Sequence, residues 1–328
     1  MRLLPDLIDP ATITGFAREE VDAYDAGTGT LSEIFPSETT DDLTVEWLVG
    51  KRDEDVATYR AFDAEASIGG GGGGEKRTAG LAAVARKYRF SEYDQLIRRG
   101  INSPETVEQA AEKLATKAAK AVVNRQILAR GEVLATGKLV IREDGFFQTA
   151  DYGRRADFTA TAATLWDGGG DVLADLETWT QAYEDVNGVL PEVAYVSRRV
   201  ATALLRSEKV RAYMGTNAPS VITLEDVNRV IIAQGYTPLT VVSARVDGRA
   251  VLPDDRLILA RASAGATVWG PTLEATDPAY GLEFADQPGL YVGAYGTDDP
   301  KATWIRGNAT VLPVLHDADA TFAAKVVA

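Results

Sequence analysis

The stretch AVVNRQILARGEVLATG, residues 121–137, decides the fold of this chain. It closes a run rich in Ala, Lys, Gln and Leu that begins at Ser103. Ser103 is a good N-cap, Pro104 suits the first helical position, and Gly137 suits the residue that follows a helix. We therefore expect one helix over residues 103–136, about 50 Å long at 1.5 Å per residue. That is longer than a compact domain normally requires.

The apolar residues of this helix recur at steps of three and four. They give a narrow stripe of mostly small side chains along one face, as expected of a strut that packs along another element. The stripe runs through Val107, Ala111, Leu114, Ala118, Ala121, Val122, Arg125 and Leu128.

Residues 1–44 are mixed in character and interrupted by Pro and Gly. A short helix is possible over Ile13–Tyr24, but otherwise the segment is typical of an extended N-terminal arm. Its apolar residues are too scattered to form a core, so we expect them to lie on another surface of the same chain or of a neighbour. They are Leu3, Leu4, Leu7, Ile8, Leu31, Ile34 and Phe35.

Residues 45–92 contain six consecutive glycines, Gly69 to Gly74. Residues Ala57–Ala66 precede them, and the imperfectly alternating segment Thr78–Phe90 follows them. This pattern predicts a long β-hairpin with a flexible glycine tip. An isolated two-stranded ribbon is marginally stable in water, so we expect it to contact something outside itself, most naturally an adjacent subunit.

Beyond the helix, short strands alternate with helices, and the region from residue 267 is rich in strands. The pattern predicts the α+β class, with one compact unit of helices and short strands in the middle of the chain. We expect strands over Lys138–Arg142, Gly145–Tyr152, Val193–Val196, Leu239–Val242, Leu257–Ala260, Leu290–Tyr295, Ala302–Ile305 and Thr310–Leu315, and helices over Asp171–Glu184, Ser197–Leu205 and Leu224–Gln234.

The composition narrows the classes of function. The chain has 34 basic and 48 acidic residues, a net charge of -14, which argues against a broad nucleic-acid surface. The absence of Cys excludes disulfides, thiolate catalysis and Cys-based zinc sites. No stretch approaches the ~18 apolar residues of a membrane span, so we expect no membrane partner.

No motif predicts a cofactor or a metal ion. The sequence GGGGGGEKRT at Gly69–Thr78 lacks the Gly-Lys-Ser/Thr junction of a phosphate-binding loop, and Gly168–Gly170 are interpreted as a turn or hinge. The single histidine, His316, lies among Asp residues, but one His cannot make a multi-histidine site. We interpret it as a loop residue and expect no cofactor and no metal ion.

Catalytic patterns are also missing. Ser243 and Ser263 belong to no nucleophile motif, and pairs such as Asp254-Asp255 arise by chance among so many carboxylates. Arg98-Arg99 is the tightest basic pair near a structural boundary, and we expect it to bind acidic groups of a neighbour rather than nucleic acid. The sequence therefore predicts no catalytic residue and no enzyme.

The order of parts resembles the coat proteins of tailed phages, which share the HK-ninety-seven-type fold. The closest likeness is to the lambda-type branch, the phage major capsid protein E family. Three segments carry this likeness: the helix end at residues 121–137 with its Leu-x-Thr-Gly turn, the segment Ala194–Leu205 with Val210–Tyr213, and the turn Leu252-Pro253-Asp254-Asp255 with the strand that follows it, together with Gly265–Thr276 and Leu312–Leu315.

The resemblance implies a domain organisation. Residues 1–44 would be the N-terminal arm, 45–92 the extended β-hairpin loop and 103–136 the spine helix. Residues 137–158 and 261–328 would form the peripheral domain, and 159–260 the axial domain. Candidate contacts with a neighbouring subunit are Ile68, Gly69, Gly70, Gly71, Gly72, Gly73, Gly74, Arg86, Lys87, Arg89, Arg98 and Arg99.

The same resemblance implies a function. The chain would be a major capsid protein that assembles with itself into hexamers and pentamers of an icosahedral head around double-stranded DNA, without sequence-specific contacts to that DNA. It would be found in the virion and, during assembly, in the host cytoplasm. Expected partners are a scaffold protein, a portal and a possible decoration protein. A cellular nanocompartment shell and an α/β enzyme with an unrecognised site are the alternatives.

Overall fold

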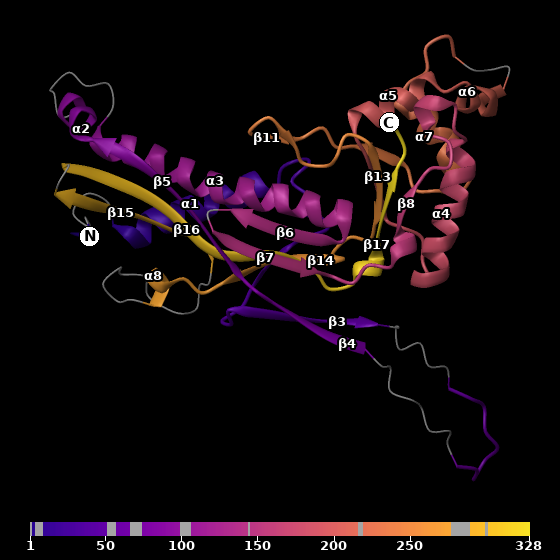
Figure 1. The fold of residues 1–328 in the computed structure, drawn as a ribbon, viewed down its shortest axis with the longest axis horizontal. Coiled ribbons are helices and arrows are strands. Elements are labelled where there is room, and N and C mark those ends of the chain that lie inside the picture. The colour runs from indigo at the N-terminus through magenta and orange to yellow at the C-terminus, as the bar shows by residue number, and fades with distance from the viewer. Residues whose placement is uncertain are drawn as a thin grey trace.

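Helix α3 (Val107–Thr136) runs through the middle of the computed structural model (Figure 1). Its N-cap is Thr106 rather than the expected Ser103, which lies outside the described residues. Thr106 and Gln109 form a capping box, in which the Thr106 hydroxyl accepts from the Gln109 N–H at 3.2 Å and the Gln109 side chain accepts from the Thr106 N–H at 3.1 Å. Gly137 ends the helix in the left-handed region, as predicted, with φ 71°.

The structure describes residues 2–3, 9–50, 57–65, 74–98, 106–143, 145–215, 219–276, 289–298 and 301–328. Its mixture of helices and sheets confirms the α+β class. Several predicted elements are present, with bounds that differ by a few residues from those expected. The short elements outside the main layers are β6 (Lys138–Glu143), β7 (Phe146–Asp151), β11 (Arg245–Val246), β12 (Arg249–Ala250), α2 (Glu92–Arg98), α8 (Leu273–Thr276), and the 3-10 turns η1 (Ala156–Phe158), η2 (Trp166–Gly168) and η5 (Ala318–Ala320).

The first sheet packs against α3 and the N-terminal helix α1 (Pro10–Asp25). Its longest strand, β16, pairs along its first half with β15 and along its second half with β14, while β5 pairs with residues Ala302–Val311 of β16. The sheet therefore joins segments that are far apart in the sequence. Its strands are β1 (Arg2–Leu3), β2 (Ser37–Thr39), β5 (Ala82–Ser91), β14 (Gly265–Gly270), β15 (Tyr291–Asp298) and β16 (Lys301–Leu315).

The second sheet has the order β10-β9-β13-β17-β8 and is mixed. Strand β13 is antiparallel to both of its neighbours, whereas the two outer pairs are parallel. We call this sheet and its four helices the second lobe, which lies at one end of the molecule in Figure 1. It contains β8 (Thr159–Thr161), β9 (Val193–Val196), β10 (Leu239–Val241), β13 (Arg256–Ala260), β17 (Thr321–Lys325), α4 (Val172–Asn187), α5 (Arg198–Arg206), α6 (Glu208–Met214) and α7 (Leu224–Ala233).

The second sheet is a wall between two hydrophobic cores. Successive side chains of a strand point to opposite faces. In β9, Ala194 and Val196 belong to the second lobe's core, while Tyr195 belongs to the core around α3. In β13, Leu259 faces the second lobe and Ile258 faces α3. Both faces are buried, which explains why these strands are continuous apolar runs rather than alternating ones.

The last strand departs from the expected domain division. We expected 261–328 to join 137–158, but β17 lies in the second sheet, between β13 and β8. Its Phe322 packs in the second lobe, with its ring centroid 5.3 Å from that of Phe158. The region is rich in strands, as expected, but β17 was not among the predicted strands, and the strands expected over Ala302–Ile305 and Thr310–Leu315 are the single strand β16. The partner of a strand depends on residues distant in sequence.

The expected hairpin is also built differently. The strand expected over Thr78–Phe90 is two strands, because β4 (Gly74–Gly80) ends and β5 then pairs with β16 in the first sheet. The partner of β4 is β3 (Thr44–Gly50), not Ala57–Ala66, of which the described residues 57–65 form no strand. The alternating pattern of Thr78–Phe90 therefore did indicate strand structure, but its residues belong to two strands in different sheets.

The N-terminal segment is packed on its own chain. The possible helix at Ile13–Tyr24 is the longer α1, capped by Asp9, which accepts from the Thr12 N–H at 2.9 Å. Leu31, Ile34 and Phe35, which we placed on a surface of the same chain or of a neighbour, are buried in the core around α3. The side chains of the other apolar residues named for the arm, Leu3, Leu4, Leu7 and Ile8, are not described.

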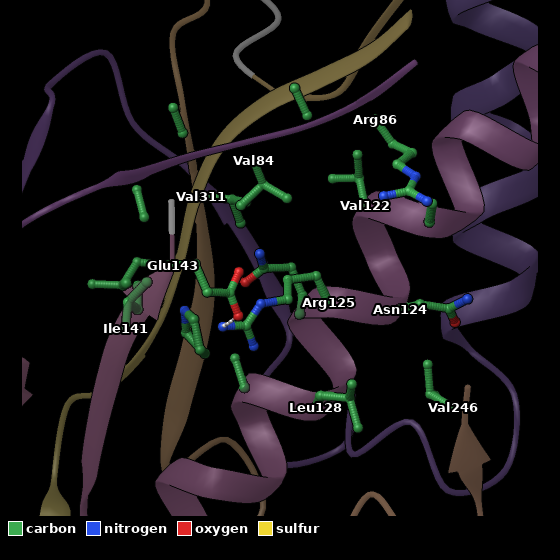
Figure 2. A pocket seen from close by; sticks show the side chains of 18 of the residues that line it. Val84, Arg86, Val122, Asn124, Arg125, Leu128, Ile141, Glu143, Val246 and Val311 are labelled. Carbon is green, nitrogen blue, oxygen red and sulfur yellow. Dashed lines mark hydrogen bonds and ion pairs between the residues drawn. The ribbon is translucent and has the colours of Figure 1, made fainter. Parts of the chain in front are cut away.

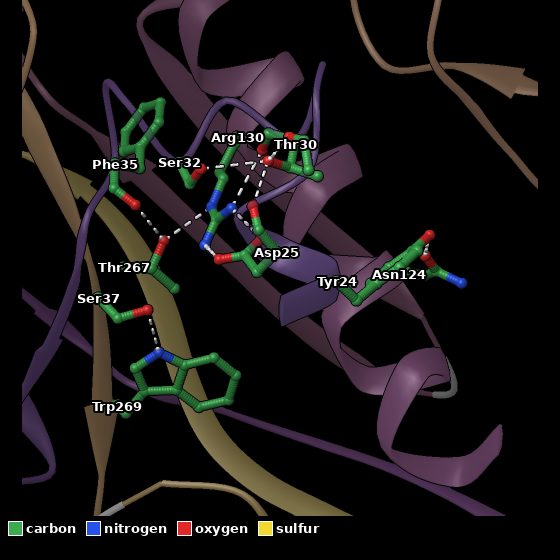
Figure 3. Close-up of polar contacts among 11 residues, drawn as sticks. Tyr24, Asp25, Thr30, Ser32, Phe35, Ser37, Asn124, Arg130, Thr267 and Trp269 are labelled. Atoms are coloured by element: carbon green, nitrogen blue, oxygen red, sulfur yellow. Dashed lines mark hydrogen bonds and ion pairs between the residues drawn. The ribbon is translucent and has the colours of Figure 1, made fainter. Parts of the chain in front are cut away.

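Arg130 of α3 holds this segment in place (Figure 3). Its guanidinium is fully buried and makes two bonds to the Asp25 carboxylate, from Nη1 at 2.6 Å and from Nη2 at 2.8 Å. Nη1 also donates to the Thr30 carbonyl at 3.0 Å, and Nε donates to the Thr267 hydroxyl at 2.8 Å. One cation thus joins the end of α1, the loop after it, α3 and β14.

Replacing Arg130 by Met should lower the free energy of unfolding by about 3–5 kcal/mol, because it leaves the Asp25 carboxylate largely buried without its partner. Urea unfolding of the unassembled protein measures this. The double variant Arg130→Met with Asp25→Leu should recover part of the loss, since no unpaired charge remains. A loss below about 1 kcal/mol for the single variant would contradict the role given to this pair.

Gly131, inside α3, lies directly against the loop before β13. A Cβ at this position would lie within van der Waals overlap of the Val251 carbonyl oxygen, at 1.7 Å. Glycine normally costs a helix about 1 kcal/mol relative to Ala. The close contact explains why it is kept here.

Gly131→Ala should therefore destabilise the protein by about 1–3 kcal/mol in urea unfolding, despite the better helix propensity of Ala. Gly15→Ala in α1 is a matched control, because nothing lies within 4 Å of its added Cβ. That change should raise stability by about 0.5–1 kcal/mol. Equal effects of the two substitutions would show that the Val251 contact is not what determines the residue at 131.

Candidate assembly surfaces

Strands β3 and β4 form a ribbon that projects from the body of the molecule (Figure 1). The pairing is antiparallel and runs from Thr44 opposite Gly80 to Gly50 opposite Gly74. Residues 57–65 continue beyond the ribbon and lie far from both cores in Figure 1. A segment with this shape exposes surface that its own chain does not cover.

One face of the ribbon is anchored at its base. Trp47 is buried, and its ring centroid lies 5.1 Å from that of Tyr152. Arg77 Nη1 donates to the Asp151 carbonyl at 3.1 Å, and Gln148 Nε2 donates to the Gly80 carbonyl at 2.6 Å. The ribbon base is thereby fixed to the β6–β7 hairpin and to the residues just after it.

Large apolar side chains are uncovered on the other face of the ribbon and in the segment beyond it. Leu48 alternates with Trp47 and is 70% exposed. Tyr59 and Phe62, in the segment 57–65, are fully exposed. Large apolar side chains gathered on one projecting element are typical of a surface that another molecule covers.

Helix α2 is a second uncovered element, and our sequence reasoning missed it. No residue of the helix is buried, and Tyr93, Leu96 and Ile97 are 71%, 62% and 53% exposed. Ser91 and Asp94 cap it reciprocally, with the Ser91 hydroxyl donating to Asp94 Oδ2 at 2.6 Å, a bond that lowers the pKa of Asp94. The Ser-x-x-Asp spacing is the sequence signal that would have located it.

A hollow of about 740 Å³ lies between α3, β5 and the β6–β7 hairpin (Figure 2). Arg125 and Glu143 form an ion pair beside it, with Nη2 3.0 Å from Oε1. Gln126 also lines it, and the Gln126 Oε1 atom is buried without a hydrogen-bond partner among the described residues. Phe146, near the tip of the hairpin, lines it as well, and the neighbouring Phe147 is 74% exposed. The hollow therefore offers both apolar and polar groups.

The structure brings together only some of the predicted contact residues. Arg86, Lys87 and Arg89 are all exposed on β5, where Arg86 lines the hollow and Lys87 lies 4.7 Å from the centroid of the Trp304 ring. Arg98 is bound within its own helix, where Nη1 donates to the Asp94 carbonyl at 3.2 Å. Gly74 is the first residue of β4. Ile68, Gly69, Gly70, Gly71, Gly72, Gly73 and Arg99 lie outside the described residues.

The ionisable residues that were considered as metal ligands or catalytic groups form ordinary ion pairs with nearby side chains. His316 Nε2 lies 3.5 Å from Glu38 Oε2, and Asp254 pairs with Arg245 at 3.0 Å. Among the residues that the structure describes, no group of three His, Asp or Glu side chains could hold a metal ion. In the same residues, no helix combines the length and the apolar character needed to cross a membrane.

Two arginines stabilise the C-terminal end of α3, where the two cores meet. Arg154 Nη1 donates to the Leu134 carbonyl at 2.7 Å, and Arg256 Nη1 donates to the Ala135 carbonyl at 2.6 Å. Cations at this end of a helix are favoured by its dipole. Burial, and then the charge of Arg256, lower the pKa of Arg154 to about 10. The bond from Arg256 thus joins the helix to β13 of the second lobe.

Comparison with known proteins gives a consistent result. A family model described as phage major capsid protein E matches residues 30–326. The fold is similar to that of a putative prophage capsid protein of E. coli CFT073, with 14% identity and TM-score 0.63 over 96% of this chain and 99% of that chain. None of the curated proteins matches the sequence.

Two further solved structures share the fold. A phage-related protein of Bordetella bronchiseptica RB50 is 14% identical, with TM-score 0.61 over 99% of this chain and 97% of that chain. An encapsulin of Synechococcus elongatus PCC 7942 is 13% identical, with TM-score 0.51 over 92% of this chain and 88% of that chain. At these identities the likeness concerns the fold.

Trp47→Ala should detach the ribbon base and lower the free energy of unfolding by about 3–5 kcal/mol, because a buried indole ring is lost. It should also make the ribbon more susceptible to limited proteolysis. Leu48→Ala, on the exposed face of the same strand, is the control and should change stability by less than about 0.5 kcal/mol. Similar losses for the two variants would contradict the assignment of the two faces.

Proposed function

The chain belongs to the phage major capsid protein E family, and on this premise we propose that its copies form hexamers and pentamers that close an icosahedral shell around double-stranded DNA. It is a coat protein, a structural component of a bacteriophage head. The observation that carries the proposal is the set of apolar side chains left uncovered on the ribbon, in residues 57–65, on α2 and on β7: Leu48, Tyr59, Phe62, Tyr93, Leu96, Ile97 and Phe147.

These surfaces suit an assembly that depends on many modest contacts. In Figure 1 the ribbon and α2 lie at different extremities of the molecule, whereas the β6–β7 hairpin lies alongside α3. Each surface is small, but closed symmetry repeats every contact around the shell. Of residues 45–92, the ribbon and the segment beyond it would reach over a neighbouring subunit. Strand β5 stays in the first sheet of its own chain, with Arg86, Lys87 and Arg89 available for a neighbour's carboxylates.

The remaining domain roles follow from the same proposal. Residues 1–44 would act as the N-terminal arm and 103–136 as the spine. Residues 137–158, with most of 261–328, would form the peripheral domain. Residues 159–260, completed by β17, would form the axial domain around the symmetry axes. The placement of β17 in the second sheet supports this modified boundary.

Further partners belong to the proposal as well. A scaffold protein, a portal and a decoration protein would meet the shell, which would form in the host cytoplasm and end in the virion. The net charge of -14 supports a contact in which DNA does not adhere to the shell, because the acidic protein and the DNA phosphates repel each other. The role requires no cofactor and no catalytic residue.

A nanocompartment shell is the second candidate, favoured by the fold likeness to the encapsulin. The two functions differ in content, since a nanocompartment encloses a cargo protein whereas a phage head encloses DNA. Nuclease-resistant DNA in particles purified from infected or induced cells would support the phage head. Particles filled with one cellular enzyme and free of DNA would support the nanocompartment.

Electron microscopy of the full chain, expressed with and without its scaffold, tests assembly directly. Wild-type protein should form closed icosahedral particles, and protein that stays monomeric under all assembly conditions would overturn the proposal.

Leu96→Ser with Ile97→Ser in α2 should reduce the particle yield at least about tenfold, since removing apolar contact area weakens each repeated interface. Folding stability should change by less than about 0.5 kcal/mol, because α2 buries no residue. Leu96→Met with Ile97→Val retains the apolar area and should assemble normally.

A further inference from the structure

The second lobe carries a hollow of about 570 Å³ between α5, the start of α6, η2 and the chain's C-terminal residues. Trp166, Ala203 and Val327 contribute apolar surface. Three basic side chains, Arg199, Arg206 and Lys209, and two acidic ones, Asp167 and Glu208, also line it. The hollow therefore combines apolar surface with cations.

Its positive charge is poorly matched within the chain. Asp167 accepts a bond from the Ala328 N–H at 3.0 Å, and Lys209 Nζ lies 3.6 Å from Asp171. Arg199 and Arg206 are exposed, and neither forms an ion pair with any residue that the structure describes. Unmatched cations on the surface of a chain whose net charge is -14 indicate an acidic partner.

The same lobe carries a surface of complementary chemistry. We call residues 184–190, at the end of α4 and just beyond it, the acidic corner. Glu184 and Asp185 are exposed there, and Val189 and Leu190 are 49% and 42% exposed. Gly188 turns the chain between the two pairs, in the left-handed region with φ 69°. Carboxylates thus lie beside apolar side chains, matching the cations and apolar surface of the hollow.

The acidic corner cannot fill the hollow of its own chain. The N-terminal end of α4 lies beside the hollow, because Asp171 contacts Lys209 and Asp175 accepts from Trp166 Nε1 at 2.8 Å. Helix α4 has 16 residues and is therefore about 24 Å long. Its C-terminal end, which begins the acidic corner, is separated from the hollow by that length.

We propose that the acidic corner of one subunit docks into the hollow of a neighbouring subunit, with Glu184 and Asp185 meeting Arg199 and Arg206. The two surfaces differ and lie apart on the same lobe, so the contact is head-to-tail. Head-to-tail contacts generate rings when the rotation closes. The inference rests on the proposed shell function and adds the pair of surfaces that join its second lobes.

The apolar part of the hollow favours a protein segment over nucleic acid. A phosphate backbone would leave Trp166, Ala203 and Val327 without an apolar partner and would approach Asp167 and Glu208. Val189 and Leu190 of the acidic corner supply apolar groups of suitable size. Binding of DNA to the same cations is the alternative that the experiment must detect.

Charge reversal tests the proposal. Arg199→Glu with Arg206→Glu should reduce the particle yield at least about tenfold at ~0.15 M salt, because like charges then face each other. Glu184→Arg with Asp185→Arg should do the same. All four substitutions together should restore the yield to within about twofold of wild type, since the charges are exchanged rather than lost. Urea unfolding should show that each variant folds, because all four side chains are exposed.

Glu177→Arg on α4 and Arg229→Glu on α7 are matched controls, since both residues are exposed and lie outside the two surfaces. They should assemble within about twofold of wild type. Normal assembly of the two charge-reversed pairs would overturn the inference while leaving the shell function intact, and so would failure of the fourfold variant to recover. Normal particles of the arginine variant that package less DNA would assign the hollow to DNA instead. Failure of wild-type protein to assemble would count against the shell function itself.

Discussion

The buried guanidinium of Arg130 is the interaction on which the arrangement of this molecule depends. A cation removed from water must have its hydrogen bonds satisfied, and here Asp25, Thr30 and Thr267 satisfy them. These partners come from α1, the following loop and β14. Because a shift of any of them would leave a buried N–H of the cation without its acceptor, α3 and the first sheet hold one fixed relation. The rest of the chain is built on that rigid body.

On this body, function is carried by surfaces rather than by a pocket. The ribbon is fixed at Trp47 but presents Leu48 outward, because a strand points successive side chains to opposite faces. Helix α2 buries nothing in its own chain, so its apolar side chains are available to a neighbour. A coat protein needs this combination of a rigid centre and projecting contact elements, since each weak contact gains strength from repetition around the shell.

The second lobe is joined to that body through shared strands. The second sheet buries both faces, one against α3 and one against its own helices, and Arg154 and Arg256 bind the last carbonyls of α3 at the same junction. This construction places the hollow at Arg199 and the acidic corner at Glu184 in fixed positions relative to the spine. Complementary charges held apart on one rigid lobe can meet only between copies, which makes them suitable for specifying how neighbours are arranged.

The sequence by itself determined the elements whose signals are local, and the family. The end of α3 at Gly137, the strand Val193–Val196 and the helix capped by Ser197 were predicted because capping, turn and periodicity signals lie within a few residues of each other. The tertiary structure alone decided the strand partners, the burial of Arg130 and the groups that meet at each surface. The pairing of β5 with β16 and of β17 with β13 joins residues tens to hundreds of positions apart, and no local pattern encodes such partners. Local hydrogen bonds fix the elements, whereas burial of their faces fixes how they combine.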